Sequence, residues 1–219
     1  MELGIVEAEV LPPSRHQTYY IVENNLSIFL VSGCLFRVHR YLFEESPVFR
    51  DMFSIPPGEE GVEGESDTAP IVLPEITQQE FEALLDFLYD RGYDGYRDFN
   101  VRKWINVLSI SSRFEFDKVR ARAIKELTEL EPSLDAIEEI LLAQKYEVPQ
   151  WIFPGLTKLL IRSKIPDLSE AERLPLDMVL SVWRAREEFI RAQSQRSAFV
   201  TPNPQTYLRK HFNCPPYTT

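Results

Sequence analysis

The hydrophobic pattern of the chain changes period once, within residues 19–53. The first part reads YYIVENNLSIFLVSGCLFRVHR, where β-branched and aromatic runs alternate with turn-forming Asn-Asn and Ser-Gly pairs, which predicts a strand pair. The second part, YLFEESPVFRDMF, repeats apolar residues at helical spacing. Ser46 and Pro47 divide it into two short helices, because serine caps a helix start and proline fits the first helical turn. The strand pair is therefore followed directly by helices.

Composition and periodicity divide the rest of the chain. Residues 1–17 and 193–219 lack a hydrophobic period and carry Pro, Ser, Thr and Asn, which predicts a flexible leader and a disordered tail. Residues 54–70 are acidic and rich in Gly and Pro, and they predict an exposed loop inside a mixed domain over 18–130. Residues 131–192 predict a purely helical part.

The later elements follow from the spacing of apolar residues. PIVLP at 70–74 predicts a short strand, and Thr77 with Glu80 has the spacing of a capping box at a helix start. Helices are predicted over 101–112, 115–130, 133–145, 149–163, 169–173 and 175–192. In the last of these helices, we expect the core-facing residues to be Leu176, Val179, Leu180 and Trp183.

Charge and cysteine content narrow the function classes. A net charge of −10 argues against general nucleic-acid binding, which needs a basic face. The two cysteines, Cys34 and Cys214, lie at opposite ends of the chain and form no disulfide framework, so we expect a reducing compartment, cytoplasm or nucleus. No apolar run reaches the length of a bilayer, so we expect no membrane association.

The residue types for catalysis are present but do not form a recognisable pattern. His39, Ser46 and Asp51 lie close in sequence, without the Gly-x-Ser-x-Gly turn that presents a hydrolase nucleophile. The favoured interpretation is a packed histidine and a helix cap, with a small hydrolase as the alternative of another class. His211-x-x-Cys214 gives only half a metal site, and no glycine-rich phosphate loop is present. We therefore expect no catalytic, cofactor or metal site.

Several separated motifs resemble a BTB/POZ domain. They are LFRVHRYLFEESPVFRDMF, the acidic loop, PIVLPEITQQEFEALLDFLYD and the helix pair that follows. The chain is also similar to the large BTB group of mushroom-forming (basidiomycete) fungi in YYIVENNLSIFLV, AQKYEVPQWIFPGLTKLLIRSK and LSEAERLPLDMVLSVWRARE. This resemblance runs from about Tyr19 to about Glu188.

The resemblance implies a fold and a class of function. The fold is α+β, a small mixed sheet flanked by helices over 18–130, followed by an all-helical C-terminal extension. The implied function is a non-enzymatic protein–protein interaction module that adapts substrates to a cullin-type ubiquitin ligase scaffold. A nuclear co-regulator and a homotypic scaffold remain alternatives. In the family the His-Arg pair and the following serine are structural, so His39 and Ser46 are expected to be structural too.

The resemblance also implies a partner-binding surface and a homodimer formed through the N-terminal segment and the first helix. We assign to this surface Arg40, Tyr41, Leu42, Tyr89 and Asp90. One departure concerns the acidic residue that the family often places opposite this arginine. Here the position holds Asn24 or Asn25, and a neutral amide pairs less strongly with a part-buried arginine. The sequence therefore leaves the oligomeric state open.

Overall fold

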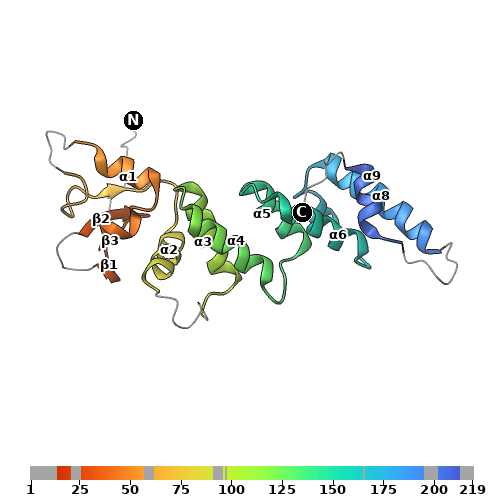
Figure 1. Cartoon of the computed structure of the whole chain (residues 1–219), viewed down its shortest axis with the longest axis horizontal. Helices are drawn as coiled ribbons and strands as arrows, with labels where there is room; N and C mark the ends of the chain where they lie inside the picture. The colour runs from red at the N-terminus through yellow and green to blue at the C-terminus, as the bar shows by residue number, and fades with distance from the viewer. Residues whose placement is uncertain are drawn as a thin grey trace, which may run out of the picture. The chain divides into compact units, whose positions relative to one another are not determined.

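The chain forms two compact units, residues 1–126 and 127–219, in a computed structural model (Figure 1). The boundary falls inside α4 (Asp117–Glu129). The structure describes residues 14–20, 26–56, 62–90, 96, 98–164, 166–194 and 202–212.

The N-terminal unit contains a mixed four-stranded sheet in the order β1-β3-β2-β4. Its strands are β1 (Ser14–Tyr20), β2 (Leu26–Val31), β3 (Cys34–His39) and β4 (Ile71–Val72). β2 and β3 form the predicted antiparallel pair, whereas β1 joins β3 and β4 joins β2 in parallel. At the hairpin turn Ser32 and Gly33 both have positive φ, as the tight turns that match strand twist require.

β1 corrects the predicted flexible leader. Residues 14–17 belong to this strand, and only residues 1–13 of the leader lie outside the described residues. The segment SRHQTYY was missed because charged and polar residues interrupt it, and its backbone pairs with only one neighbouring strand. An edge strand needs no apolar alternation when its side chains form ion pairs instead.

The helices of the N-terminal unit follow the sheet. They are η1 (Arg40–Phe43), α1 (Pro47–Ser54), α2 (Gln78–Tyr89), α3 (Val101–Arg113) and α4. The predicted caps are confirmed: the Ser46 hydroxyl accepts a hydrogen bond from the Phe49 N–H at the start of α1. Thr77 and Glu80 form a reciprocal capping box at the start of α2.

Phenylalanine rings fill the space between the sheet and these helices. Phe29 of β2, Phe43 of η1 and Phe49 of α1 are fully buried. The Phe43 ring centroid lies 4.9 Å from that of Phe29 and 4.9 Å from that of Phe49. Ring pairs at this separation add to the stability that burial itself supplies. The core therefore lies directly beneath η1, and it fixes the position of that short helix.

The segment predicted as an acidic loop over 54–70 is partly built into the fold. Residues 57–61 lie outside the described residues, but Gly64 pairs with the sheet. Its carbonyl accepts from the Ile28 N–H at 2.8 Å, and its own N–H donates to the Ala69 carbonyl at 2.7 Å. A Cβ on Gly64 would lie 2.8 Å from Ile71 Cδ1. Residues 62–70 thus form a mostly exposed loop, as predicted, but Gly64 attaches this loop to the sheet.

The C-terminal unit is helical, as predicted. Beyond α4 its elements are α5 (Ala136–Lys145), η2 (Pro149–Trp151), α6 (Ile152–Ile161), α7 (Leu168–Ala171), α8 (Leu176–Ser194) and α9 (Pro204–His211). α9 corrects the predicted disordered tail, because it packs beside α8 (Figure 1). Leu208 is fully buried, and Lys210 Nζ lies 2.8 Å from a carboxylate oxygen of Glu188.

The buried face of α8 differs from the predicted one. Val182, Ala185 and Phe189 enter the core of the C-terminal unit. Of the stripe that we expected inside, Val179 is partly buried, whereas three residues are exposed. These are Leu176 at 73% exposed, Leu180 at 42% and Trp183 at 48%. Both stripes recur at helical spacing, so periodicity alone could not choose between them.

Candidate interaction surfaces

The short helix η1 buries one aromatic side chain, Phe43, and exposes another, Tyr41. Phe43 is completely buried, Leu42 is half-buried, and Tyr41 is 55% exposed. The Tyr41 ring centroid lies 5.5 Å from that of His39, which directly precedes η1. The buried Phe43 anchors this short helix, so the exposed Tyr41 is carried on a supported element.

Arg40 is held by the end of α1. Its Nη2 donates to the Phe53 carbonyl at 3.0 Å, and its guanidinium carbon lies 4.2 Å from the centre of the Phe53 ring. A cation is favoured there, because the last carbonyls of a helix carry partial negative charge. Asn24 and Asn25, which we expected opposite Arg40, lie outside the described residues.

Tyr89 joins the end of α2 to the end of β3. Its oxygen accepts from the His39 N–H at 3.0 Å and lies 2.8 Å from His39 Nδ1. Burial raises the pKa of Tyr89, so the phenol keeps its proton. Asp90, the residue after α2, is exposed. We call the five predicted partner-binding residues, Arg40, Tyr41, Leu42, Tyr89 and Asp90, the Tyr41 face.

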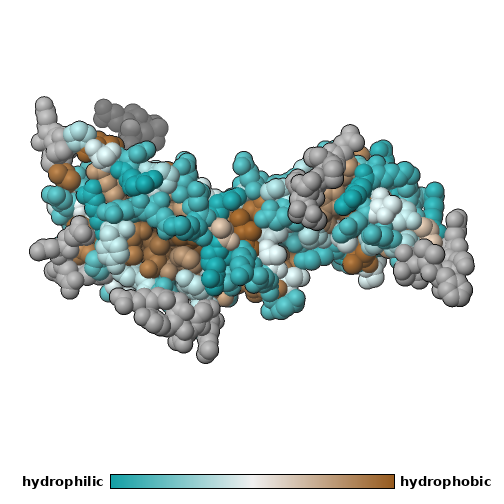
Figure 2. All heavy atoms as spheres, in the orientation of Figure 1, coloured by the Kyte–Doolittle hydropathy of each residue, from teal (hydrophilic) through white to brown (hydrophobic). Residues whose placement is uncertain are grey.

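Hydrophobic side chains also gather on the surface of the N-terminal unit around α2 (Figure 2). Tyr41 is one of several large apolar side chains that this unit exposes; Ile55, directly after α1, is 70% exposed, and Val72 of β4 is 58% exposed. An apolar patch such as the one around α2 is typical of protein-binding sites, whereas single exposed residues are common on any protein.

The residues considered as a nucleophilic set serve the fold. Ser46 is fully buried; its hydroxyl accepts from the Phe49 N–H and donates to the Phe114 carbonyl. The hydrogen-bond partner of the His39 ring is Tyr89, and Asp51 is exposed on α1. A serine that is capping one helix and tethering the end of another is not presented to a substrate.

β1 is fastened to the rest of its unit by ion pairs and hydrogen bonds. Arg15 Nε donates to Asp67 at 2.9 Å, and the Tyr20 hydroxyl donates to the same carboxylate. The Tyr20 hydrogen bond and then the Arg15 guanidinium hold the pKa of Asp67 below its usual range. Further along the strand, His16 Nε2 lies 2.6 Å from a Glu82 oxygen in a polar groove of about 650 Å³ between β1 and α2. These side chains form hydrogen bonds and ion pairs with one another, and the contacts attach β1 to the rest of its unit.

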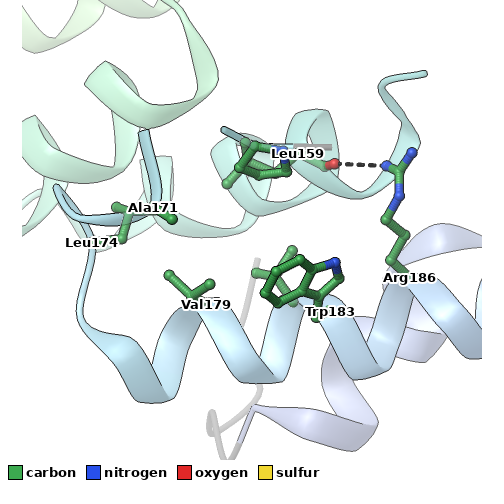
Figure 3. A pocket seen from close by; sticks show the side chains of 8 residues that line it. Leu159, Ala171, Leu174, Val179, Trp183 and Arg186 are labelled. Atoms are coloured by element: carbon green, nitrogen blue, oxygen red, sulfur yellow. Dashed lines mark hydrogen bonds between the residues drawn. The ribbon is translucent and has the colours of Figure 1, made fainter. Parts of the chain in front are cut away.

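α8 borders two hollows in the C-terminal unit. Under Trp183 lies a cavity of about 20 Å³, where Trp183 and Val179 rise from α8 toward Leu159 (Figure 3). That volume holds a single water at most. Arg186 closes one side by donating to the carbonyls of Leu159 at 3.2 Å and Leu160 at 2.8 Å.

The second hollow is an open groove of about 380 Å³ along the outer side of α8. Its lining includes Trp183, Ile190, Arg184 and Glu187, which lie outside the partner-binding surface assigned from the sequence. The sequence carries a signal for this groove, because Leu180, Trp183, Glu187 and Ile190 are spaced by three, four and three residues. We had interpreted Leu180 and Trp183 as core residues.

None of the helices in the described part of the chain combines the length and apolar content needed to traverse a bilayer. Over the same residues, no group of three or more His, Cys, Asp and Glu side chains is arranged to hold a metal ion.

The strand pair, the buried helix cap and the helix pair occur in the order that the resemblance implied, and a family model decides the assignment. The model of the BTB/POZ domain matches residues 26–131. This stretch is a BTB/POZ domain. The BTB/POZ match begins at β2 and ends shortly after α4, so β1 and α5–α9 lie outside it. No curated protein matches the chain in sequence. BTB/POZ domains are protein–protein interaction modules, and they also mediate homodimer contacts.

Proposed function

We propose that this chain is a non-enzymatic adaptor. Its BTB/POZ unit binds a protein partner through the Tyr41 face, and its C-terminal helical unit carries a second binding surface. The observation that supports this proposal is the 55% exposure of Tyr41 on a helix whose next-but-one residue, Phe43, is completely buried.

The Tyr41 face is preorganised for binding. Arg40 donates a hydrogen bond to the Phe53 carbonyl, and Tyr89 is hydrogen-bonded to His39, whose ring lies 5.5 Å from that of Tyr41. An aromatic side chain held by such neighbours loses little conformational entropy when a partner covers it. Exposed tyrosines and arginines in such settings are the residue types that dominate binding energy.

The partner class we favour is a cullin-type ubiquitin ligase scaffold, with the chain acting in the cytoplasm or the nucleus of a fungal cell. The family resemblance and an apolar, aromatic surface support this choice. A nuclear co-regulator and a homotypic scaffold are the alternative functions, and the experiment below tests cullin binding against pairing between BTB/POZ units.

The orientation of Arg40 does not depend on an acidic residue at position 24 or 25. Its guanidinium donates to the Phe53 carbonyl within its own chain and lies over the Phe53 ring. The carbonyl satisfies a donor but carries no net charge, so a partner that covers Arg40 has to supply a negative group or leave the guanidinium in contact with water.

The test compares two exposed positions of the same unit. Tyr41→Ala should weaken binding of a recombinant cullin N-terminal region about tenfold or more, the effect of losing an aromatic anchor. Val72→Ala is the matched control, since Val72 is 58% exposed on β4 and lies outside the Tyr41 face. A cullin that binds both variants equally, or does not bind the wild-type chain, contradicts the adaptor role. Sedimentation of the same two variants reports on pairing between BTB/POZ units.

A further inference from the structure

α8 carries an apolar row that its own unit leaves largely exposed, although Trp183 also borders the small cavity beside Leu159. Four large side chains are between 42% and 73% exposed, and we call them the α8 stripe: Leu176, Leu180, Trp183 and Ile190. Glu187 occupies the next position in the same row. Their spacing alternates between four and three residues, which is the pattern of a helix that packs along another helix.

The other sides of α8 are already used within the unit. Val182, Ala185 and Phe189 are in the core, and the guanidinium of Arg186 binds the carbonyls at the end of α6. Glu188 is paired with Lys210 of α9. The α8 stripe is thus an apolar surface of this helix that neighbouring described elements cover only in part, and such rows mark interaction sites.

The charged residues beside the α8 stripe are arranged in opposite signs along the helix. Asp177 lies in its first turn, and Arg191 in its last. Arg184 and Glu187, both exposed, lie close to the middle. Glu187 has an ion pair with Arg191 at 2.6 Å, with 65% and 69% of these side chains exposed. An ion pair with this exposure contributes little to stability, so either residue can pair with a residue of another chain at a small cost in free energy.

We propose that the α8 stripe binds the α8 stripe of a second copy of this chain, with the two helices antiparallel. When the two-fold axis passes near Ala185, the middle of the helix, Leu180 lies opposite Ile190 of the second copy, and Trp183 lies opposite its Glu187. Along the edges of the contact, Asp177 approaches Arg191 of the second copy, and Arg184 approaches its Glu187. The same register overlaps the two 19-residue helices fully, over about 28 Å.

The charged residues beside the α8 stripe favour a second copy of the chain in the antiparallel orientation. Two-fold pairing requires a surface that is complementary to itself, so that each residue contacts a different residue of the partner and receives the same contact in return. The antiparallel register meets this requirement with opposite charges at both ends and at the centre. A parallel register would place Glu187 against Glu187 and Arg184 beside Arg184, and like charges at an interface are repelled.

The contact is distinct from the Tyr41 face, and a charge exchange tests it alone. In a Tyr41→Asp background, which removes pairing through the Tyr41 face, Arg184→Glu makes the centre of the α8 stripe wholly acidic and Glu187→Arg makes it wholly basic. Each variant should sediment as a monomer at low ionic strength. A mixture of the two should form a heterodimer, and the chain that carries both substitutions should dimerise with itself again. Leu168→Asp is the control, since Leu168 is 75% exposed on α7 outside the stripe and should not affect dimerisation.

A disulfide experiment reads the orientation directly and uses the full chain with Cys214→Ser. Under mild oxidation, a mixture of Leu180→Cys and Ile190→Cys chains should cross-link, whereas neither chain alone should. A parallel contact would instead cross-link each chain with itself.

The proposal is overturned if the parent chain, which carries Tyr41→Asp only, remains monomeric at high micromolar concentration. Charge variants that pair with themselves as readily as with each other overturn it as well.

Discussion

The oxygen of Tyr89 lies 2.8 Å from Nδ1 of His39 and accepts the backbone N–H of the same residue at 3.0 Å. This double contact joins the last residue of α2 to the last residue of β3, across a large separation in sequence. It explains why a histidine that precedes an exposed helix is structural: its ring orientation is set by a phenol of its own unit. Within the Tyr41 face, Tyr89 thus fixes the residue that directly precedes η1.

Tyr89→Phe should therefore destabilise the BTB/POZ unit by about 1–3 kcal/mol, because His39 is left with two polar atoms that lose a part-buried partner. The measurement is urea unfolding followed by circular dichroism. Tyr41→Phe is the control, since Tyr41 is 55% exposed and the loss of its hydroxyl should change the stability little. Equal stability of the two variants would mean that the His39–Tyr89 contact contributes nothing.

Gly64→Ala should lower the melting temperature more than Gly33→Ala. Both glycines have positive φ, so both substitutions strain the backbone by about 1–3 kcal/mol. At Gly64 the new Cβ would also lie 2.8 Å from Ile71 Cδ1, whereas at Gly33 it meets no atom within 4 Å. Replacing residues 57–61 with five Gly and Ser residues should change the melting temperature little, because the loop keeps its length and therefore its closure entropy. Equal effects at the two glycines would show that residues 62–70 do not pack on the sheet.

Asp67→Asn should weaken the attachment of β1 in a pH-dependent way. The folded state lowers the pKa of Asp67, so its carboxylate stabilises the fold above the unfolded pKa of about 3.9. That contribution disappears as the pH falls from about 4 through the lower folded pKa. The melting temperature of the wild type should thus exceed that of the variant modestly at pH 7, and the difference should shrink below pH 4. A difference that is constant over this range would indicate that the charge of Asp67 is not involved.

Leu208→Ala should destabilise the C-terminal unit by about 2–5 kcal/mol, the usual cost of truncating a buried leucine. Leu208 is completely buried between α9 and its neighbours, although it lies in a region that the sequence predicts to be disordered. Thermal unfolding of the full chain, compared with Leu168→Ala at an exposed position, measures the effect. If both variants melt like the wild type, α9 is not part of the folded unit.

The elements with local signals were predictable from the sequence. Ser46-Pro47 and the Thr77–Glu80 box are start signals that act within one turn, and both helices begin where these signals predict. The hairpin turn at Ser32-Gly33 is equally local. Such features depend on the few residues around them, so tertiary contacts did not change them.

The elements that depend on distant partners were missed. β1 is a polar strand whose stability comes from Asp67 and Glu82, far away in sequence. α9 is a short helix that is held by its packing on α8, although Asn203 and Pro204 supply a readable start. For α8 the sequence contains two apolar rows, and only the packing of α6 and α9 decides which of them is buried. The Tyr41 face, by contrast, was placed by a family resemblance, and its role in binding stays a prediction.

Two self-complementary surfaces on one chain have a consequence that neither has alone. The α8 stripe lies in one unit, and the Tyr41 face lies in the other. If the α8 stripe binds only another α8 stripe and the Tyr41 face binds only another Tyr41 face, each chain has two separate binding sites. Every copy added at the end of an assembly then leaves one of its two sites free. Assembly then does not stop at a dimer unless the geometry closes a ring. The number of chains in the resulting assembly would depend on protein concentration and salt. A chain with a single charge reversal on α8 could bind only through its Tyr41 face and would therefore end the assembly.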